Sequence, residues 1–204
     1  MNGLKKFNVL IVVDMQNDLV FGDLKSERSI GIVKPVVNKI NKYVEDKDGV
    51  IIFTKHTNFE DDLETEDEKD NRKKYCIYNT EGWELIDPIK EIIEEYRINQ
   101  GNVTKMTVVE KSSFGATVLG NYAFADLGIH TNSRQISQDV EVEVIGLHTD
   151  TSVLSNVVIT KSFLPNARVL VDAYCCAGTS SEAQATALKE LELLHTVVYY
   201  GFTE

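Results

Sequence analysis

The sequence predicts a single α/β domain over residues 1–204, in which helices cover both faces of a parallel sheet of about six strands. Three observations support this three-layer α/β/α architecture. Short, continuous apolar runs alternate with longer segments of helical periodicity. The length of 204 residues suits one domain, and the 43% of hydrophobic residues can fill its core. Strands that are apolar on both sides are typical of a parallel sheet covered on both faces.

The first half of the chain supplies three strands and two helices. The run VLIVV at 9–13 is β-branched and wholly apolar, and shorter runs at 50–53 and 107–109 are expected to be the next strands. Segments 32–44 and 85–96 each carry an apolar stripe at three- and four-residue spacing, which predicts helices.

The second half continues the alternation. A helix is expected at 116–127, a strand at 140–145 that ends before Gly146, and a helix at 151–163 that stops before Pro165. A strand at 167–171, a helix at 181–194 capped by Ser181, and a last strand at 196–200 complete the domain.

Composition excludes several classes of protein. The net charge of −11 disfavours nucleic acid as a partner. No apolar run approaches the roughly 20 residues that span a bilayer, and no secretory apolar region precedes the first strand, so no membrane association is expected. Three cysteines are too few for a disulfide scaffold, which favours a cytoplasmic location. The acidic loop at 60–70 is expected to be solvated, or else to admit cations and repel anions.

Polar residues follow the strand-like runs at the places where ligands bind in open α/β sheets. Asp14 ends the first run, Lys111 ends the third, and Ser152 follows the fourth at the start of a helix. A hydroxyl at a helix N-terminus, beside a carboxylate and a lysine, suits a nucleophile with an oxyanion site next to it.

Five motifs carry a resemblance to a known family: VVDMQND at 12–18, YCIYNTEGWEL at 75–85, EKSSFGATVL at 110–119, GLHTDTSVLSN at 146–156 and DAYCCAG at 172–178. In this order they resemble the isochorismatase-like hydrolases, also called the cysteine hydrolase superfamily, which includes nicotinamidases and N-carbamoylsarcosine amidase. The resemblance runs nearly end to end.

The resemblance implies a catalytic set. Asp14 matches the aspartate that takes the proton of the nucleophile, Lys111 matches the lysine that lowers the pKa of the nucleophile, and Ser152 lies where the family keeps its cysteine. The backbone N–H groups of Thr151 and Ser152 match the oxyanion hole. A cis peptide is expected between Leu147 and His148. Apart from the resemblance, the side chains of Trp83, Phe114 and Tyr174 are expected either to form aromatic walls for a planar ligand or to serve as plain packing.

Two features depart from the family pattern. A serine hydroxyl is much harder to ionise than a thiol, so Ser152 should be slow or inert on amides. The positions of the nicotinamidase metal ligands are occupied by His56, Asn58 and Tyr75, a degraded set, so no metal or other cofactor is expected.

The expected function is hydrolysis of a non-peptide C–N bond, through an acyl-enzyme, in a small planar compound that is amide-like or derived from a nucleotide. The alternative is a catalytically inactive member that binds, sequesters or senses such a small molecule. A purely structural scaffold is a third reading. The resemblance also implies a homodimer or homotetramer.

Overall fold

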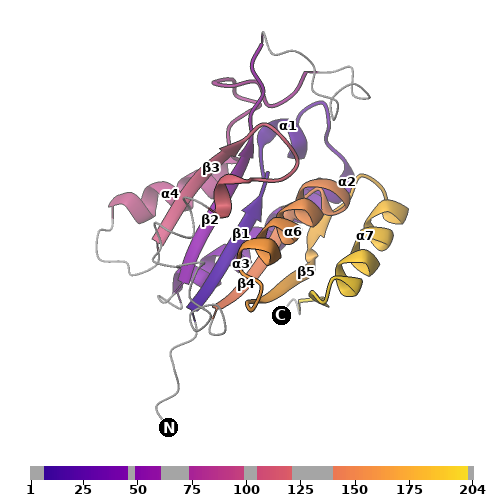
Figure 1. The fold of residues 1–204 in the computed structure, drawn as a ribbon. Coiled ribbons are helices and arrows are strands. Elements are labelled where there is room, and N and C mark those ends of the chain that lie inside the picture. Colours follow the sequence, from indigo (N-terminus) through magenta and orange to yellow (C-terminus); the bar gives the residue numbers. More distant parts are fainter. Residues whose placement is uncertain (1–6, 46–48, 61–73, 99–104, 121–139, 202–204) are drawn as a thin grey trace.

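Six parallel strands form one sheet at the centre of the described part of the chain (Figure 1). The computed structural model describes residues 7–45, 49–60, 74–98, 105–120 and 140–201. The strands are β1 (Phe7–Val13), β2 (Gly49–His56), β3 (Lys105–Lys111), β4 (Val140–Leu147), β5 (Arg168–Ala177) and β6 (Val197–Tyr199). Their order is β3-β2-β1-β4-β5-β6, which confirms the predicted fold class.

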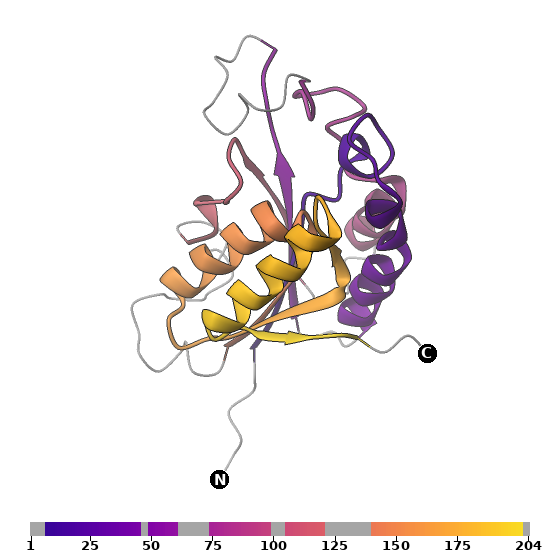
Figure 2. The same cartoon turned by 90° about the vertical axis from the view of Figure 1, so that its right-hand side faces the viewer.

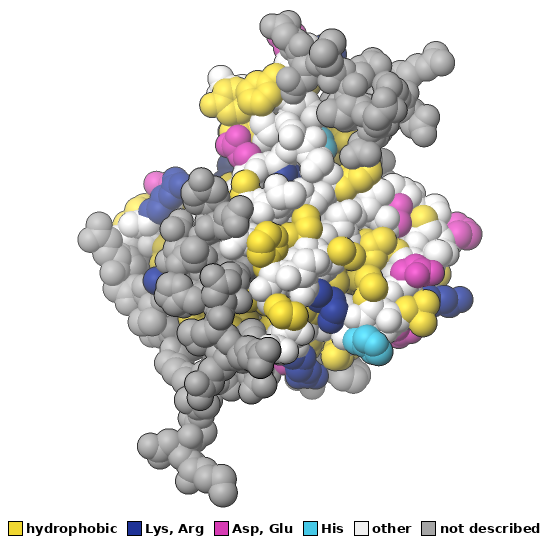
Figure 3. Space-filling model, in the orientation of Figure 1, with side chains coloured by type: hydrophobic (Ala, Val, Ile, Leu, Met, Phe, Trp, Pro, Cys, Tyr) yellow, Lys and Arg dark blue, Asp and Glu magenta, His cyan; other side chains and the backbone are white. Residues whose placement is uncertain are grey.

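Helices cover both faces of the sheet, as Figure 2 shows from the side. On one face lie α3 (Val33–Glu45) and α4 (Asp87–Ile98), and on the other lie α6 (Leu154–Phe163) and α7 (Ser181–Leu193). Two short helices, α1 (Asn17–Val20) and α2 (Glu27–Gly31), follow β1, and the π-helical turn η3 (Thr149–Val153) follows β4. The space-filling view in Figure 3 shows apolar side chains scattered among polar ones on the α6 and α7 face.

The central strands are buried because helices shield them on both sides. Val9 to Val13 of β1 have no exposed surface, and every residue of β2 is buried. The edge strand β3 instead mixes exposed and half-buried residues up to Glu110, and only its last residue, Lys111, is buried. The chain passes from β1 to β2 and β3 on one side, and β4 then pairs with the other side of β1. The strand order therefore reverses between β1 and β4, where open α/β sheets bind ligands.

Gly146 shapes the end of β4. Its φ is +117°, and a Cβ there would lie 2.2 Å from the carbonyl oxygen of Val13 on the neighbouring strand. Only a residue without a side chain fits this contact and this backbone conformation. The pairing of β4 with β5 also shifts between Val144 and Gly146. The next peptide bond, between Leu147 and His148, is cis.

Several element boundaries differ from the sequence expectation. β5 continues to Ala177 instead of stopping at 171, because Cys176 and Ala177 still pair with Gly146 and Leu147 of β4. The buried carboxylate of Asp172 within the strand pairs with Lys39 of α3 at 2.9 Å. The cap of α7 is Ser180, not Ser181: its hydroxyl accepts a hydrogen bond from the N–H of Ala183 at 3.0 Å. α1 and α2 were not expected.

Some expectations fall outside the described residues. Apart from Glu60, the acidic loop at 60–70 is outside them, and so is most of the helix expected at 116–127. Within the described ranges, the helices are all too short or too polar to cross a membrane.

Candidate functional site

The three expected catalytic side chains meet at the carboxyl ends of β1, β3 and β4. Lys111 Nζ lies 2.6 Å from Asp14 Oδ2, and the two side chains are each 2% exposed. The same Nζ lies 3.5 Å from the hydroxyl of Ser152. An ammonium group thus joins a carboxylate to a hydroxyl in a site that is nearly closed to water.

Neighbouring groups hold this pair in place. Asp14 has a φ of +49°, which an aspartate tolerates, and its carboxylate accepts a 2.6 Å hydrogen bond from the Thr54 hydroxyl on β2. Lys111 Nζ also donates to the carbonyl of Ser113 at 3.0 Å and lies 3.5 Å from His56 Nδ1. The ammonium is therefore surrounded by acceptors, as a buried lysine requires.

Ser152 lies in η3, immediately before α6. Asn156, one turn further on, donates to the Ser152 carbonyl at 2.8 Å and to the Phe114 carbonyl at 3.2 Å, and its amide oxygen accepts from Ala116 N–H. The loop after β3 is thereby fastened to the turn that carries the hydroxyl. Asn156 was not among the residues expected from the sequence, although its position four residues after Ser152 places both on one helical face.

One of the two expected oxyanion donors already has a hydrogen-bond partner. The N–H of Thr151 already donates to the carbonyl of His148 at 3.2 Å within the turn. This bond makes Thr151 a poor donor to a developing oxyanion, because its N–H is already committed. That the N–H of Ser152 donates to the oxyanion stays a prediction.

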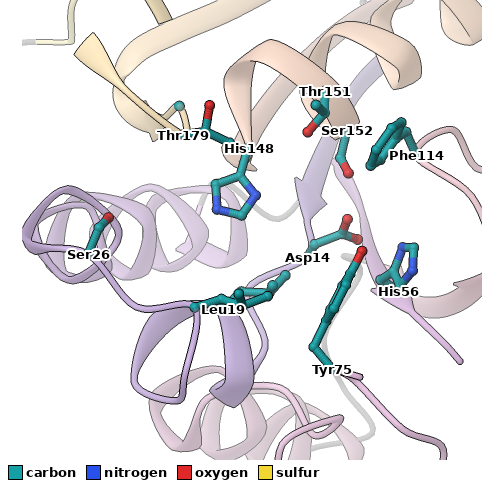
Figure 4. Close-up of a pocket in the computed structure, with 12 residues that line it drawn as sticks. Asp14, Leu19, Ser26, His56, Tyr75, Phe114, His148, Thr151, Ser152 and Thr179 are labelled. Atoms are coloured by element: carbon teal, nitrogen blue, oxygen red, sulfur yellow. The ribbon is translucent and has the colours of Figure 1, made fainter. Parts of the chain in front are cut away.

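A cavity of about 240 Å³ opens above these residues. Its lining includes Asp14, Ser152 and Thr151 and an apolar side formed by Leu19, Leu24 and Phe114 (Figure 4). Its volume is below the roughly 300–1,000 Å³ of common ligand pockets, so it suits a small ligand.

Of the three aromatic residues expected in the wall, only Phe114 lines the cavity. The Trp83 indole is buried and is not part of the lining: its N–H donates to the Thr57 hydroxyl at 2.8 Å, and the ammonium of Lys55 stands over its ring. Tyr174 is 42% exposed, because it points away from the core at its position on β5. Trp83 and Tyr174 therefore do not form walls of this cavity.

The degraded metal positions form a hydrogen-bonded cluster. His56 Nε2 lies 3.1 Å from the Asn58 amide oxygen, and the amide nitrogen of Asn58 donates to the Tyr75 carbonyl at 2.9 Å. The rings of His56 and Tyr75 stack with their centroids 5.2 Å apart. With Lys111 at the other ring nitrogen and no carboxylate in the set, these residues do not fit a divalent metal. The described residues contain no group of three His, Cys, Asp or Glu side chains placed to hold a metal ion.

None of the three cysteines in the sequence replaces the missing thiol. Cys76, Cys175 and Cys176 are all buried, and the cavity lining does not include them. Burial raises the pKa of the Cys176 thiol to about 12 and also raises the pKa of the other two. A buried thiol of this kind is inert at neutral pH.

Three polar residues at one end of the cavity were not predicted as pocket residues. Ser26 caps α2, Thr179 lies in the loop after β5, and the His148 side chain points inward from the start of η3 (Figure 4). Burial lowers the pKa of the His148 imidazole; Asp150 and Asp14 act in the opposite direction. Loop residues of this kind carry no periodic signal in a sequence.

A carboxylate fastens two of the loops around the cavity. Asp150 of η3 accepts hydrogen bonds from the N–H of Thr179 at 2.8 Å and from its hydroxyl at 2.5 Å. The loop after β5 is therefore attached to the turn that carries Ser152.

Comparison with known proteins identifies the family. The family model for the isochorismatase domain matches residues 8–199. Among solved structures, a nicotinamidase/pyrazinamidase from Bacillus subtilis is 24% identical with a TM-score of 0.74, covering 96% of this chain and 99% of that one. A pyrazinamidase/nicotinamidase from Streptococcus mutans is 18% identical with a TM-score of 0.75, covering 94% and 99%.

A third similar structure, N-carbamoylsarcosine amidase from Thermoplasma acidophilum, is 17% identical with a TM-score of 0.69 and covers 97% of this chain and 96% of that one. Identities this low show a shared fold. A search of curated protein sequences finds no significant match. Because the family model spans nearly all of the chain, the resemblance drawn from the five motifs is confirmed: the chain belongs to the isochorismatase family.

Proposed function

We propose that this chain hydrolyses a non-peptide C–N bond in a small, planar, amide-like or nucleotide-derived compound, through an acyl-enzyme on Ser152. The observation that carries the proposal is the position of Lys111 Nζ, which is 2.6 Å from the Asp14 carboxylate and 3.5 Å from the Ser152 hydroxyl. Structural neighbours named as nicotinamidase and N-carbamoylsarcosine amidase support the choice of an amide-like substrate.

The proposed reaction has two halves. Ser152 Oγ attacks the carbonyl carbon and passes its proton to Asp14, while the charge of Lys111 and the backbone N–H of Ser152 stabilise the oxyanion. The C–N bond then breaks, and the nitrogen leaves with the proton held by Asp14. In the second half a water molecule gives a proton to Asp14 and attacks the ester. The acid is released, and the proton returns to Ser152.

The serine limits the rate of the first half. A lysine beside a thiol of pKa about 8.5 makes thiolate available at neutral pH, whereas the same lysine cannot ionise an alcohol. Asp14 has to remove the hydroxyl proton during the attack, and each pKa unit of mismatch costs about 1.4 kcal/mol, or tenfold in rate. Ser152→Cys is therefore expected to raise the rate by more than about tenfold.

The test compares the native chain with Ser152→Cys on a panel of small amides, ureas and carbamoyl compounds. Release of ammonia or amine reports turnover, and thermal shift reports binding. Asp14→Asn placed in the cysteine background is the control, since it removes the proton acceptor and should abolish the gain. If the cysteine form stays inert while ligands stabilise both forms, the protein is a binder instead. A native chain that is already fast would refute the protonation reasoning.

A further inference from the structure

The cavity has two chemically different ends. Asp14 and Ser152 lie at one end, where the scissile carbonyl has to bind (Figure 4). The ring of His148 points into the cavity on the other side, near Ser26 and Thr179. A substrate that presents its carbonyl to Ser152 therefore turns its distal part toward His148.

The two histidines of the cavity differ in their surroundings. His56 contacts Asn58 through one ring nitrogen and Lys111 through the other. The structure gives neither ring nitrogen of His148 a hydrogen-bond partner among the described residues. A half-enclosed imidazole without protein partners is available to a ligand, and a ligand that leaves it unpaired loses binding free energy.

The charge of the cavity decides what kind of group His148 accepts. Burial lowers the pKa of its imidazole, so the ring is neutral near pH 7 and offers one N–H donor and one nitrogen acceptor. No lysine or arginine is among the described residues that line the cavity. The ammonium of Lys111 is already paired with Asp14 at 2.6 Å. Arg28 lies beside this end of the cavity, but its guanidinium donates to the Ser181 hydroxyl and the Gln184 amide oxygen, so the lining itself offers an anionic group no counter-charge.

We propose that His148 is a specificity residue whose neutral imidazole hydrogen-bonds an uncharged polar group, such as a ring nitrogen or a hydroxyl, on the distal part of a small amide. This inference rests on the proposed function, because the reacting carbonyl at Ser152 fixes which part of the ligand faces His148. It narrows the substrate class to uncharged aromatic or planar amides with a second polar atom.

The test measures dissociation constants by calorimetry for four probes of nearly equal size: benzamide, nicotinamide, 3-hydroxybenzamide and 3-carboxybenzamide. The native serine chain is used, because its slow turnover leaves the probes intact while binding is measured. We expect nicotinamide or 3-hydroxybenzamide to bind about tenfold more tightly than benzamide, the effect of one hydrogen bond, and the carboxylate to bind more weakly than either. His148→Ala should remove the preference, and His148→Gln, which keeps a donor and an acceptor, should restore part of it.

His195→Asn is the matched control, because it removes a histidine outside the cavity lining at a left-handed backbone position that asparagine tolerates. Any of four results would overturn the proposal. The preference could survive in His148→Ala, all probes could bind equally, none could bind, or 3-carboxybenzamide could bind most tightly. Hydrolysis in the Ser152→Cys form is scored separately. Hydrolysis without the His148-dependent preference refutes this inference alone, and the preference without hydrolysis refutes the proposed reaction alone.

Discussion

Replacing Lys111 by methionine tests the buried ion pair at the centre of the site. Methionine keeps the length of the side chain and removes its charge, so the Asp14 carboxylate, 2% exposed, loses the ammonium that lies 2.6 Å away. One hydrogen bond remains to the carboxylate, from the Thr54 hydroxyl at 2.6 Å. The carbonyl of Ser113 loses its 3.0 Å contact as well.

The expected loss of stability is large. Removing one partner of a buried ion pair costs about 3–5 kcal/mol in the free energy of unfolding. Because the Thr54 hydroxyl still donates to the Asp14 carboxylate, the cost of Lys111→Met is expected at the lower end, about 3 kcal/mol. For a domain of this length, each kcal/mol lowers the midpoint of thermal unfolding by about 2–4 °C, so a decrease of about 6–12 °C is expected.

Urea denaturation and thermal unfolding followed by circular dichroism measure both quantities. The matched control is Lys90→Met, which breaks a 2.8 Å pair with Asp87 whose side chains are 42% and 79% exposed; its cost should stay below about 1 kcal/mol. The double variant Asp14→Asn/Lys111→Met should be more stable than Lys111→Met, because no unpaired charge remains. If Lys111→Met costs no more than Lys90→Met, the reasoning about a dry, coupled pair is refuted.

Three further predictions follow from other parts of the molecule. Gly146→Ala should destabilise the fold by about 3 kcal/mol or more in urea titrations, because φ is +117° and the added Cβ meets the Val13 carbonyl. A cost below about 1 kcal/mol would contradict this backbone conformation and this contact. Because burial lowers the pKa of His148 in the folded protein, the imidazole is protonated in the unfolded chain first, below about pH 6.5. The free energy of unfolding should therefore fall more steeply toward about pH 5 in the native chain than in His148→Asn. Parallel pH curves for the two proteins would contradict the lowered pKa. Light scattering should give the mass of two or four chains, since α6 and α7 expose Val158 and Leu193; the mass of one chain would rule out association.

The sequence predicted the strands that are buried on both faces and failed where a tertiary contact decides the boundary. The run at 9–13 could be predicted as a strand, because the strands of a helix-covered parallel sheet are apolar throughout. In the sequence, the polar residue Asp172 after an apolar run predicts the end of a strand. In the structure its carboxylate is buried and paired with Lys39 of α3 at 2.9 Å, and β5 continues past it. No local pattern in the chain announces that contact.

Asp14, Lys111 and Ser152 could be predicted together because the carboxyl ends of parallel strands meet at one edge of the sheet. The aromatic wall could not, since the direction of a side chain depends on its partners. The Trp83 indole instead donates to the Thr57 hydroxyl and takes no part in the lining. The inward direction of His148 depends on the backbone path after β4, which composition does not reveal.

The hydrogen bonds between Asp150 and Thr179 connect a segment that contacts the ligand to the turn that carries the nucleophile. Thr179 forms part of the cavity wall, and Asp150 stands two residues before the hydroxyl of Ser152. A loop after β5 that shifts to accept a bulkier ligand would pull the nucleophile out of reach of Lys111. Lengthening this loop to widen substrate range would therefore have to be accompanied by a change at position 150, so the two segments are expected to vary together among descendants of this chain.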